Sequence, residues 1–278
     1  MRTRAVRLLI ILAVLSAGIV SALYLSGLCR IYVLIPLLFL GCYLLLFFFW
    51  ILPFGIALLF IDKKKPMEGR VPLIDHYAKY VASFVLLFSR VDLKVSGLEM
   101  IPDESFLMVG NHRSFLDPVV EIGVMLNLQN RKVGFVAKKE LLDAPVVGRF
   151  FHSLQCLALN RGVLKEELKT ILLAARLVKE QKACIGIYPE GTRNPGDGLL
   201  PFKSGSFRIA EKAKSPIVVA VIHNSDQVKH NFPLKDTRVH LELVGVLDRD
   251  FVASHNSAQI SETVRSMMEA ALPSPAAA

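Results

Sequence analysis

The sequence predicts an α/β domain with a mixed, mostly parallel sheet flanked by helices, preceded by N-terminal hydrophobic membrane helices. Apolar residues make up 53% of the 278 residues and are concentrated in the first 61 positions, which is typical of a membrane anchor. After residue 90, short apolar runs alternate with segments of helical periodicity, as in layered α/β domains. We expect membrane-anchoring helices at 1–62, a basic linker and amphipathic interfacial helix at 63–90, the α/β domain at 91–271 and a flexible tail at 272–278.

Two uncharged stretches, 8–28 and 31–61, are each long enough to cross a bilayer, for which about 20 apolar residues suffice. Basic residues precede the first stretch and follow the second, whereas only Arg30 lies between them. The positive-inside rule therefore places both ends and the α/β domain in the cytoplasm, with a tight turn near 26–30. A shallow hairpin in one leaflet keeps this orientation. A cleaved signal peptide at 1–22 is disfavoured, because it would export the basic cluster that follows the second stretch.

An amphipathic helix is predicted directly after the basic linker. Its apolar residues recur at helical spacing, namely Leu73, Ile74, Tyr77, Tyr80, Val81, Phe84, Val85 and Phe88. Such a helix lies either in the membrane interface, close to a lipid substrate, or against the core of the domain. The sequence leaves both placements open.

The α/β domain is expected to contain seven strands and three longer helices. The strands are predicted at 93–95, 106–109, 133–137, 156–159, 183–188, 217–222 and 239–247, and the helices at 118–128, 164–180 and 205–214. In the second helix, six apolar residues predict the face that packs on the core: Leu164, Leu168, Ile171, Leu172, Ala175 and Val178.

Cysteine spacing and net charge exclude several classes of protein. The four cysteines form no CxxC pair, and no histidine has a partner at the spacing of a zinc motif, so we expect reduced thiols and no metal. The net charge of +9 occurs without a nucleic-acid-binding motif. An anionic membrane surface and anionic substrates account for this charge.

The loop after the strand 106–109 carries a histidine and an aspartate five positions apart, His112 and Asp117. If the loop folds back, the carboxylate can bind one ring nitrogen and leave the other free to accept a proton. Asp117 followed by Pro118 is also a common helix start, with Asp as the N-cap residue.

A second loop follows the strand 183–188 and contains Glu190, Gly191, Thr192 and Arg193. Together the two loops resemble those of the glycerolipid acyltransferase family, which includes the 1-acylglycerol-3-phosphate acyltransferases. His112 and Asp117 match the HX4D signature of the family, and the second loop matches its PEGTR-type block. Residues 137–141 with 160–161, and then 216–219, match two further blocks. The four blocks occur in the family's order over roughly residues 70 to 250, which makes the resemblance specific.

The resemblance implies a membrane enzyme of phospholipid biosynthesis. It would move a fatty acyl group from acyl-CoA or acyl-carrier protein to the sn-2 hydroxyl of 1-acylglycerol-3-phosphate (lysophosphatidic acid), giving phosphatidic acid. His112 would act as the general base and Asp117 would orient it. Residues at matching positions imply that Lys138, Arg161 and Arg193 hold the phosphate.

Other roles at the site stay open on sequence grounds. Glu190 would orient the acceptor or hold Arg193, and Gly191 and Thr192 would form a tight turn close to the ligand. Asn111 or the first amides of the helix 118–128 would serve the oxyanion.

Three other functions use the same residues less well. The first is acylation of another lysolipid, such as a lyso-ornithine lipid, or of glycerol-3-phosphate. The second is hydrolysis of lipid esters, which the absence of a serine nucleophile motif disfavours; Ser114 is interpreted as a turn residue. The third is a lipid-binding scaffold without activity, which would not need the His112–Asp117 pair. The expected partners are membrane lipids and the acyl donor, without nucleic acid, a metal or a separate cofactor.

Overall fold

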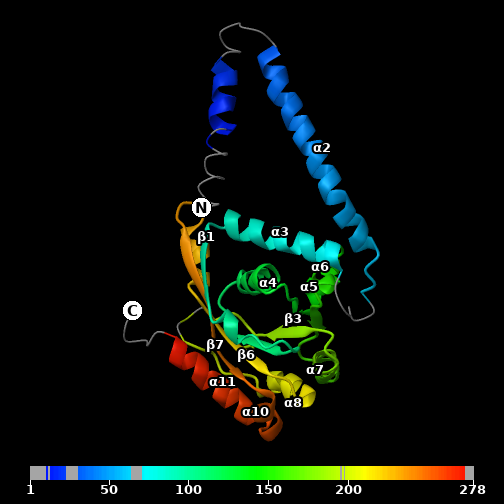
Figure 1. Cartoon of the computed structure of the whole chain (residues 1–278), viewed down its shortest axis with the longest axis vertical. Helices are drawn as coiled ribbons and strands as arrows, with labels where there is room; N and C mark the ends of the chain where they lie inside the picture. The colour runs from blue at the N-terminus through cyan, green and yellow to red at the C-terminus, as the bar shows by residue number, and fades with distance from the viewer. Residues whose placement is uncertain are drawn as a thin grey trace. The chain divides into compact units, whose positions relative to one another are not determined.

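The computed structural model of the chain describes residues 11, 13–22, 31–63, 71–194, 196 and 198–272. The chain divides into two compact units, Met1–Ala57 and Leu58–Ala278, whose elements are drawn in Figure 1. The helices are α2 (Ile31–Leu59), α3 (Pro72–Phe88), α4 (Asp117–Leu128), α5 (Lys139–Asp143), α6 (Val147–Ser153), α7 (Leu164–Lys179), α8 (Arg208–Ala213), α9 (Val228–Asn231), α10 (Arg249–Ser254) and α11 (Ser257–Ala271). The short 3-10 helices are η1 (Leu98–Met100), η2 (Ser204–Phe207) and η3 (Ser225–Gln227). The strands are β1 (Val91–Ser96), β2 (Leu107–Gly110), β3 (Val133–Lys138), β4 (Leu157–Leu159), β5 (Cys184–Ile187), β6 (Ile217–His223) and β7 (Thr237–Leu247).

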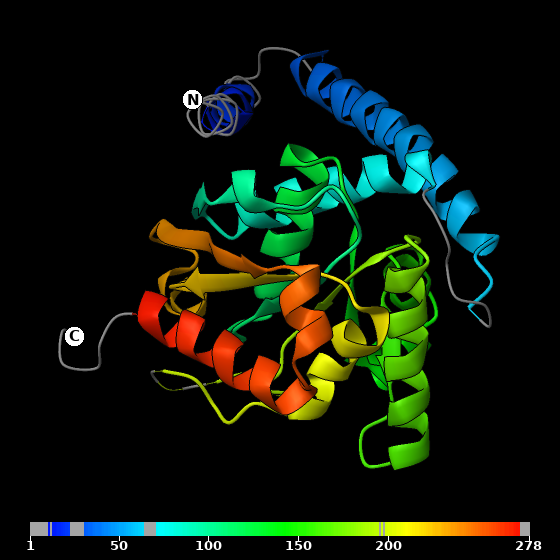
Figure 2. The ribbon, with the colours of Figure 1, turned by 60° about the horizontal axis from the view of Figure 1, so that its bottom comes forward.

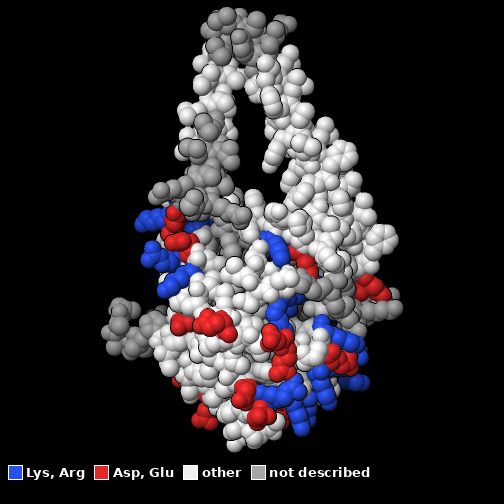
Figure 3. All heavy atoms as spheres, in the orientation of Figure 1, with Lys and Arg blue, Asp and Glu red and all other residues white. Residues whose placement is uncertain are grey.

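The first unit contains apolar helices. Within α2, the segment Leu34–Leu59 is long and apolar enough to cross a membrane, and its most apolar part is not buried. Figure 3 shows this helix without charged side chains. A second described helix, Ala13–Ala22, is apolar but shorter. The turn expected at 26–30 lies outside the described residues, as does most of the basic linker, so the choice between two spans and a shallow hairpin stays a prediction.

The second unit is built on one seven-stranded sheet in the order β1-β7-β6-β2-β5-β3-β4. The five strands from β6 to β4 in this order are parallel to their neighbours. β7 runs antiparallel to β6, and β1 runs parallel to β7. The predicted class, a mixed and mostly parallel sheet, is confirmed. Because β2, β5, β3 and β4 are adjacent and parallel, the loops that follow them emerge at one edge of the sheet.

Helices cover both faces of this sheet, α3 and α4 on one and α7, α8, α10 and α11 on the other (Figures 1 and 2). Successive residues of β2 point to opposite faces, so that Met108 joins the apolar cluster under α4 and Val109 joins the cluster under α7, α8 and α11. β2 is fully buried, as a continuous apolar run in a parallel strand predicts.

Helix α3 is apolar on two sides. Its inner side includes Ile74 and Ala82 and packs on α4. The two helices are close at Gly123 of α4, because a Cβ atom at that position would lie only 3.1 Å from Ala82 Cβ. Its outer side exposes large apolar residues: Leu73, Tyr80, Phe84, Leu87 and Phe88. The stripe predicted from the sequence therefore divides between the core and the surface. The expected placement of the helix in a membrane interface stays a prediction.

Two expectations for the helices hold only in part. In α7, Ala175 and Val178 are buried as predicted, together with Ala174 and Leu177, whereas Leu164, Leu168 and Leu172 are exposed. The helix expected at 205–214 is a 3-10 turn, η2, followed by the short α8.

The sequence interpretation also missed α11, which covers much of one sheet face. Its start carries a capping box, in which Asn256 accepts the amide of Gln259 and the Gln259 side chain accepts the amide of Asn256. This signal was present in the sequence. The predicted tail lies outside the described residues from 273 onwards.

Candidate active site

The site forms at the end of β2, where Asn111 attaches the chain to the neighbouring strand β6. Asn111 is buried, and its Nδ2 donates to the carbonyl oxygen of Ile222 (3.0 Å) while its Oδ1 accepts the Ile222 amide (2.8 Å). Both ends of the side-chain amide are thus occupied by backbone. The expectation that Asn111 serves an oxyanion stays a prediction, and its observed contacts fix where the following residue, His112, leaves the sheet.

The carboxylate of Asp117 organises the loop that follows. Its Oδ2 lies 2.9 Å from His112 Nδ1 and accepts the backbone amides of Arg113 and Ser114, at 2.7 Å each. A carboxylate only accepts, so Nδ1 carries the proton and Nε2 has a free lone pair. The N-cap residue of α4 is Leu116, not Asp117. The interpretation of Asp117 as a simple helix cap is therefore wrong.

Glu190 joins this loop to the loop after β5. Its Oε1 accepts the amide of His112 (3.0 Å) and its Oε2 accepts the amide of Leu200 (2.9 Å). The His112 carbonyl in turn accepts the Asn194 amide (2.7 Å). Glu190 is buried, and burial raises the pKa of its carboxyl. Among the residues that the structure describes, Glu190 makes no contact with Arg193, which it was expected to hold. Its carboxylate instead accepts one backbone amide from each of the two loops.

Tyr188, two residues before Glu190, supports the imidazole of His112 from one side. The two rings stack with their centroids 4.3 Å apart and their planes within 7°. Phe135 stacks on the other side of Tyr188, at 5.2 Å. The imidazole is thus held at one nitrogen by Asp117 and across one face by an aromatic ring, and both contacts restrict its rotation.

The hydroxyl of Tyr188 donates to Oε2 of Glu121, a carboxyl buried in α4 one helical turn after Asp117. Burial raises the pKa of Glu121 from 4.5 to about 8, and the charge of Asp117 adds to this shift. Glu121 is therefore mainly neutral at pH 7. The position before Asn111 is glycine, and a Cβ atom there would lie 2.7 Å from Glu121 Oε1 and 3.2 Å from the Tyr188 ring. Gly110 therefore leaves the space that this pair occupies.

Tyr188 and Glu121 were missed at the sequence level. Glu121 had a visible signal, because it is a single acidic residue within the apolar run Val120–Val124 of a helix. Tyr188 had a weaker one, as an aromatic residue at the exit of a buried strand. Arg113 was missed as well; its Nε lies 2.9 Å from Oδ1 of Asp226, and this ion pair ties the His112 loop to η3.

The predicted phosphate ligands lie at or just after the carboxyl ends of three neighbouring parallel strands, β5, β3 and β4. The guanidinium of Arg193 lies 3.5 Å from the ring centroid of Phe115, so the second loop contacts the His112 loop. Lys138 and Arg161 are exposed at the ends of β3 and β4. Within the described ranges, no hydrogen bond or ion pair joins either of them to His112 or Arg193.

The predicted turn Gly191–Thr192 is present. Gly191 has a φ of +71°, and a Cβ atom there would lie 2.9 Å from Lys203 Nζ. Both the backbone conformation and the nearby lysine therefore favour glycine at this position. Thr192 is exposed beside it.

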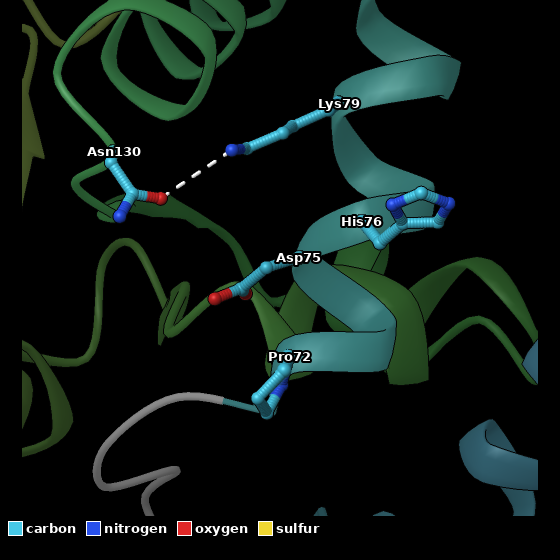
Figure 4. A pocket seen from close by; sticks show the side chains of 5 residues that line it. All are labelled: Pro72, Asp75, His76, Lys79 and Asn130. Carbon is cyan, nitrogen blue, oxygen red and sulfur yellow. Dashed lines mark hydrogen bonds between the residues drawn. The ribbon is translucent and has the colours of Figure 1, made fainter.

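A surface pocket and a possible metal-binding group lie apart from these loops. The pocket is lined by four residues of α3, Pro72, Asp75, His76 and Lys79, and by Asn130 (Figure 4). Among the described residues, one group of three His, Cys, Asp or Glu side chains is close enough to hold a metal ion, namely His223, His240 and Glu242. Neither set contains a residue of the His112 loop.

Comparisons with known proteins agree with this fold and these loops. The Acyltransferase family matches residues 92–223. A 1-acyl-sn-glycerol-3-phosphate acyltransferase of Escherichia coli K12 is 30% identical over 199 residues, which cover 69% of this chain and 79% of the relative. One from Saccharomyces cerevisiae is 33% identical over 158 residues, 54% of this chain and 51% of the relative, so the chain spans about half the length of that protein. The crystal structure of a 1-acyl-sn-glycerophosphate acyltransferase from Thermotoga maritima has the same fold, with a TM-score of 0.60, 23% identity and coverage of 72% of this chain and 78% of that chain.

The family match spans the strand that leads to His112, Asp117 and the loop of Glu190. Given the similarity to the bacterial relative over most of its length, the chain belongs to the 1-acyl-sn-glycerol-3-phosphate acyltransferase family. The family resemblance predicted from the four sequence blocks is confirmed.

The stacking of Tyr188 on His112 can be tested with two substitutions. Tyr188→Leu removes the aromatic face, and we expect kcat to fall by roughly 2- to 10-fold, since an aromatic pair contributes about 0.5–1.5 kcal/mol. Tyr188→Phe keeps the ring, and its kcat should stay closer to that of the wild type. Steady-state kinetics of acyl transfer would measure both. Equal losses in the two variants would show that the hydroxyl, not the stacking, is what matters.

The buried carboxyl of Glu121 predicts how stability depends on pH. Its pKa is about 8 in the folded protein and near 4.5 in the unfolded chain. The contribution of this carboxyl to the free energy of unfolding is therefore complete below pH 4.5 and is lost as the pH rises to about 8. Because of this group, the free energy of unfolding falls with pH by at most about 1.4 kcal/mol per pH unit. Glu121→Gln should remove this part of the slope, as measured by unfolding midpoints between pH 5 and 8. An unchanged slope would contradict the assignment.

Proposed function

We propose that the protein transfers a fatty acyl group from acyl-CoA or acyl-carrier protein to the sn-2 hydroxyl of 1-acylglycerol-3-phosphate, giving phosphatidic acid. The observation that carries this proposal is the imidazole of His112, which is held by Asp117 and Tyr188 with Nε2 left free. A thioester is already activated, so the reaction needs a base and a positioned alcohol rather than a protein nucleophile. The names of the E. coli and yeast relatives support this acceptor.

In this mechanism His112 Nε2 takes the proton of the acceptor hydroxyl while the hydroxyl oxygen attacks the carbonyl carbon of the thioester. The Asp117 carboxylate keeps the Nδ1 proton in place and stabilises the imidazolium that forms. The tetrahedral intermediate then collapses with release of the thiolate, which takes up the proton from His112. The products are the new oxygen ester and the free thiol, and His112 returns to its neutral form.

Arg193 is the phosphate ligand that the geometry supports best. Its guanidinium stacks on Phe115, three residues from His112, so the cation and the base are positioned by one contact between their loops. Guanidinium groups bind phosphate oxygens through two parallel hydrogen bonds. Arg161 and Lys138 lie farther along the same edge of the sheet and would reach the phosphate from the other side. Their side chains are exposed, and no ion pair joins either of them to another residue that the structure describes, so they are available for this role.

We further propose that the protein is anchored in a membrane and that its α/β domain lies on the cytoplasmic face of that membrane. The long apolar helix α2 would anchor it, and the exposed apolar side of α3 would lie at the interface, with Tyr80 (52% exposed), Phe84 (64%) and Phe88 (63%) among the lipids. The net charge of +9 favours an anionic surface. This placement brings the lysolipid to the site without its leaving the membrane.

Substitutions at His112 and Asp117 test the proposed chemistry. His112→Ala should lower kcat by roughly 10²- to 10⁴-fold, because a positioned base is lost. Asp117→Asn should be severely impaired too, because an amide cannot stabilise the imidazolium. Both variants should remain folded, which a far-UV circular dichroism spectrum like that of the wild type and a cooperative unfolding transition would show. Near-normal turnover by folded His112→Ala protein would rule out this mechanism.

Substitutions at the arginines test the acceptor. Arg193→Ala and Arg161→Ala should each lower kcat/KM for lysophosphatidic acid by roughly 10- to 100-fold, since charge-assisted hydrogen bonds contribute about 1.5–3 kcal/mol. Arg193→Lys should recover only part of this loss. Lys139→Ala, at an exposed lysine beside Lys138, is the matched control and should change little.

The same variants should be assayed with a monoacylglycerol, which lacks the phosphate. The wild type should use it poorly, and the arginine variants should lose little further activity on it. If the variants lose equally on both acceptors, or the wild type prefers the phosphate-free one, the phosphate assignment is wrong and another lysolipid becomes the better candidate.

A further inference from the structure

Two histidines and a glutamate meet on adjacent strands of the sheet, outside the acyltransferase site. His223 is the last residue of β6, and it lies directly opposite His240 of the antiparallel strand β7. Glu242 follows two residues after His240, so its side chain leaves the same face of the sheet. Residues far apart in the sequence are thereby brought together on a rigid backbone, which is why their spacing along the chain gave no sign of a site.

The distances between these side chains fit a small transition-metal ion. One ring nitrogen of each histidine and one carboxylate oxygen of Glu242 lie within 4.8 Å of one another. His223 Nε2 and Glu242 Oε2 are 3.3 Å apart. In a tetrahedral zinc site with bonds of about 2.0–2.2 Å, neighbouring ligand atoms are separated by about 3.4 Å. That pair already has this spacing, and the third ligand atom needs a movement of about 1.4 Å at most.

The surroundings keep the cluster ready for a cation. The side chain of His223 is only 16% exposed, and the two imidazole rings stack at 5.4 Å. Ser96 of β1 hydrogen-bonds His240 Nε2 (2.8 Å) and orients the ring. Lys94 opposes a cation, but its side chain is exposed at the sheet edge and free to extend into solvent.

We propose that His223, His240 and Glu242 form a binding site for a late first-row divalent metal ion such as Zn²⁺, with water in the remaining position. Two imidazoles and one carboxylate are a ligand set suited to zinc. The site lies outside the acyl-transfer chemistry, and its effect is to join the end of β6 to β7.

The metal site is connected to the acyltransferase site through short segments of backbone. The residue before His223 is Ile222, whose amide and carbonyl both bind Asn111, next to His112. Three residues after His223, Asp226 pairs with Arg113 in the His112 loop. A metal ion that holds His223 therefore stabilises the strand end from which the His112 loop is positioned, without being required for proton transfer.

Direct binding of Zn²⁺ to the full-length protein in detergent tests this proposal. Protein stripped with a chelator should bind one Zn²⁺ per chain at pH 7.5, measured by titration calorimetry and equilibrium dialysis, and its unfolding midpoint should rise. Loss of a residue that only supports a ligand commonly costs 10- to 100-fold in metal affinity. His223→Asn, His240→Gln and Glu242→Gln should therefore each weaken binding by roughly tenfold or more and reduce the thermal shift.

His230→Gln is the matched control, because His230 is an exposed histidine of α9 outside the cluster. It should bind Zn²⁺ as the wild type does. Absence of saturable binding up to about 100 times the protein concentration, or equal binding by the wild type and by a His223→Asn/His240→Gln double variant, would overturn the proposal. Co²⁺ offers a second readout, since its visible absorption reports tetrahedral coordination and should be lost in that double variant. None of these measurements depends on acyl transfer.

Discussion

The site depends on one buried oxygen atom, Oδ2 of Asp117, which binds three N–H groups at once. Two of them belong to the backbone and one to His112, so the same carboxylate folds the loop and holds the imidazole in it. A buried carboxylate requires such donors, because burial without them costs several kcal/mol. The conformation of the loop and the orientation of the base therefore depend on the same carboxylate. A substitution that removes the hydrogen bonds of Asp117 would disturb both.

A second buried carboxyl lies one helical turn away, and the two are not equivalent. Glu121 accepts a hydrogen bond from Tyr188, has no backbone amide among its observed donors and is kept mainly protonated by burial. Asp117 accepts two backbone amides, those of Arg113 and Ser114 in the loop before α4. Two carboxyl groups on one helix thus avoid mutual repulsion because one stays neutral. The neutral one supports the ring of Tyr188, and through that ring it supports His112.

How far the sequence predicts this protein depends on how local each feature is. Strands such as β2 were predicted because a continuous apolar run is a local signal, and the His112–Asp117 pair because both residues lie in one short loop. The Tyr188–Glu121 contact joins residues 67 positions apart, and the partners of Asn111 and Glu190 lie on other strands and loops. Nothing in the local sequence specifies them. The exposed leucines of α7 were misplaced because periodicity gives the apolar face of a helix but not how much of it a neighbour covers.

Helix α3 links the proposed membrane surface to the base through few contacts. Its inner side packs on α4 at the close approach of Ala82 and Gly123, and α4 carries both Asp117 and Glu121. The buried ion pair of Asp75 with Lys132, at 2.7 Å, ties α3 to the start of β3 as well. A buried pair of this kind contributes more to a defined geometry than to stability. The outer side of α3 would meet the lipid while its inner side rests on the helix that orients His112. The depth of the base relative to the membrane would therefore be set by the thickness of two packed helices.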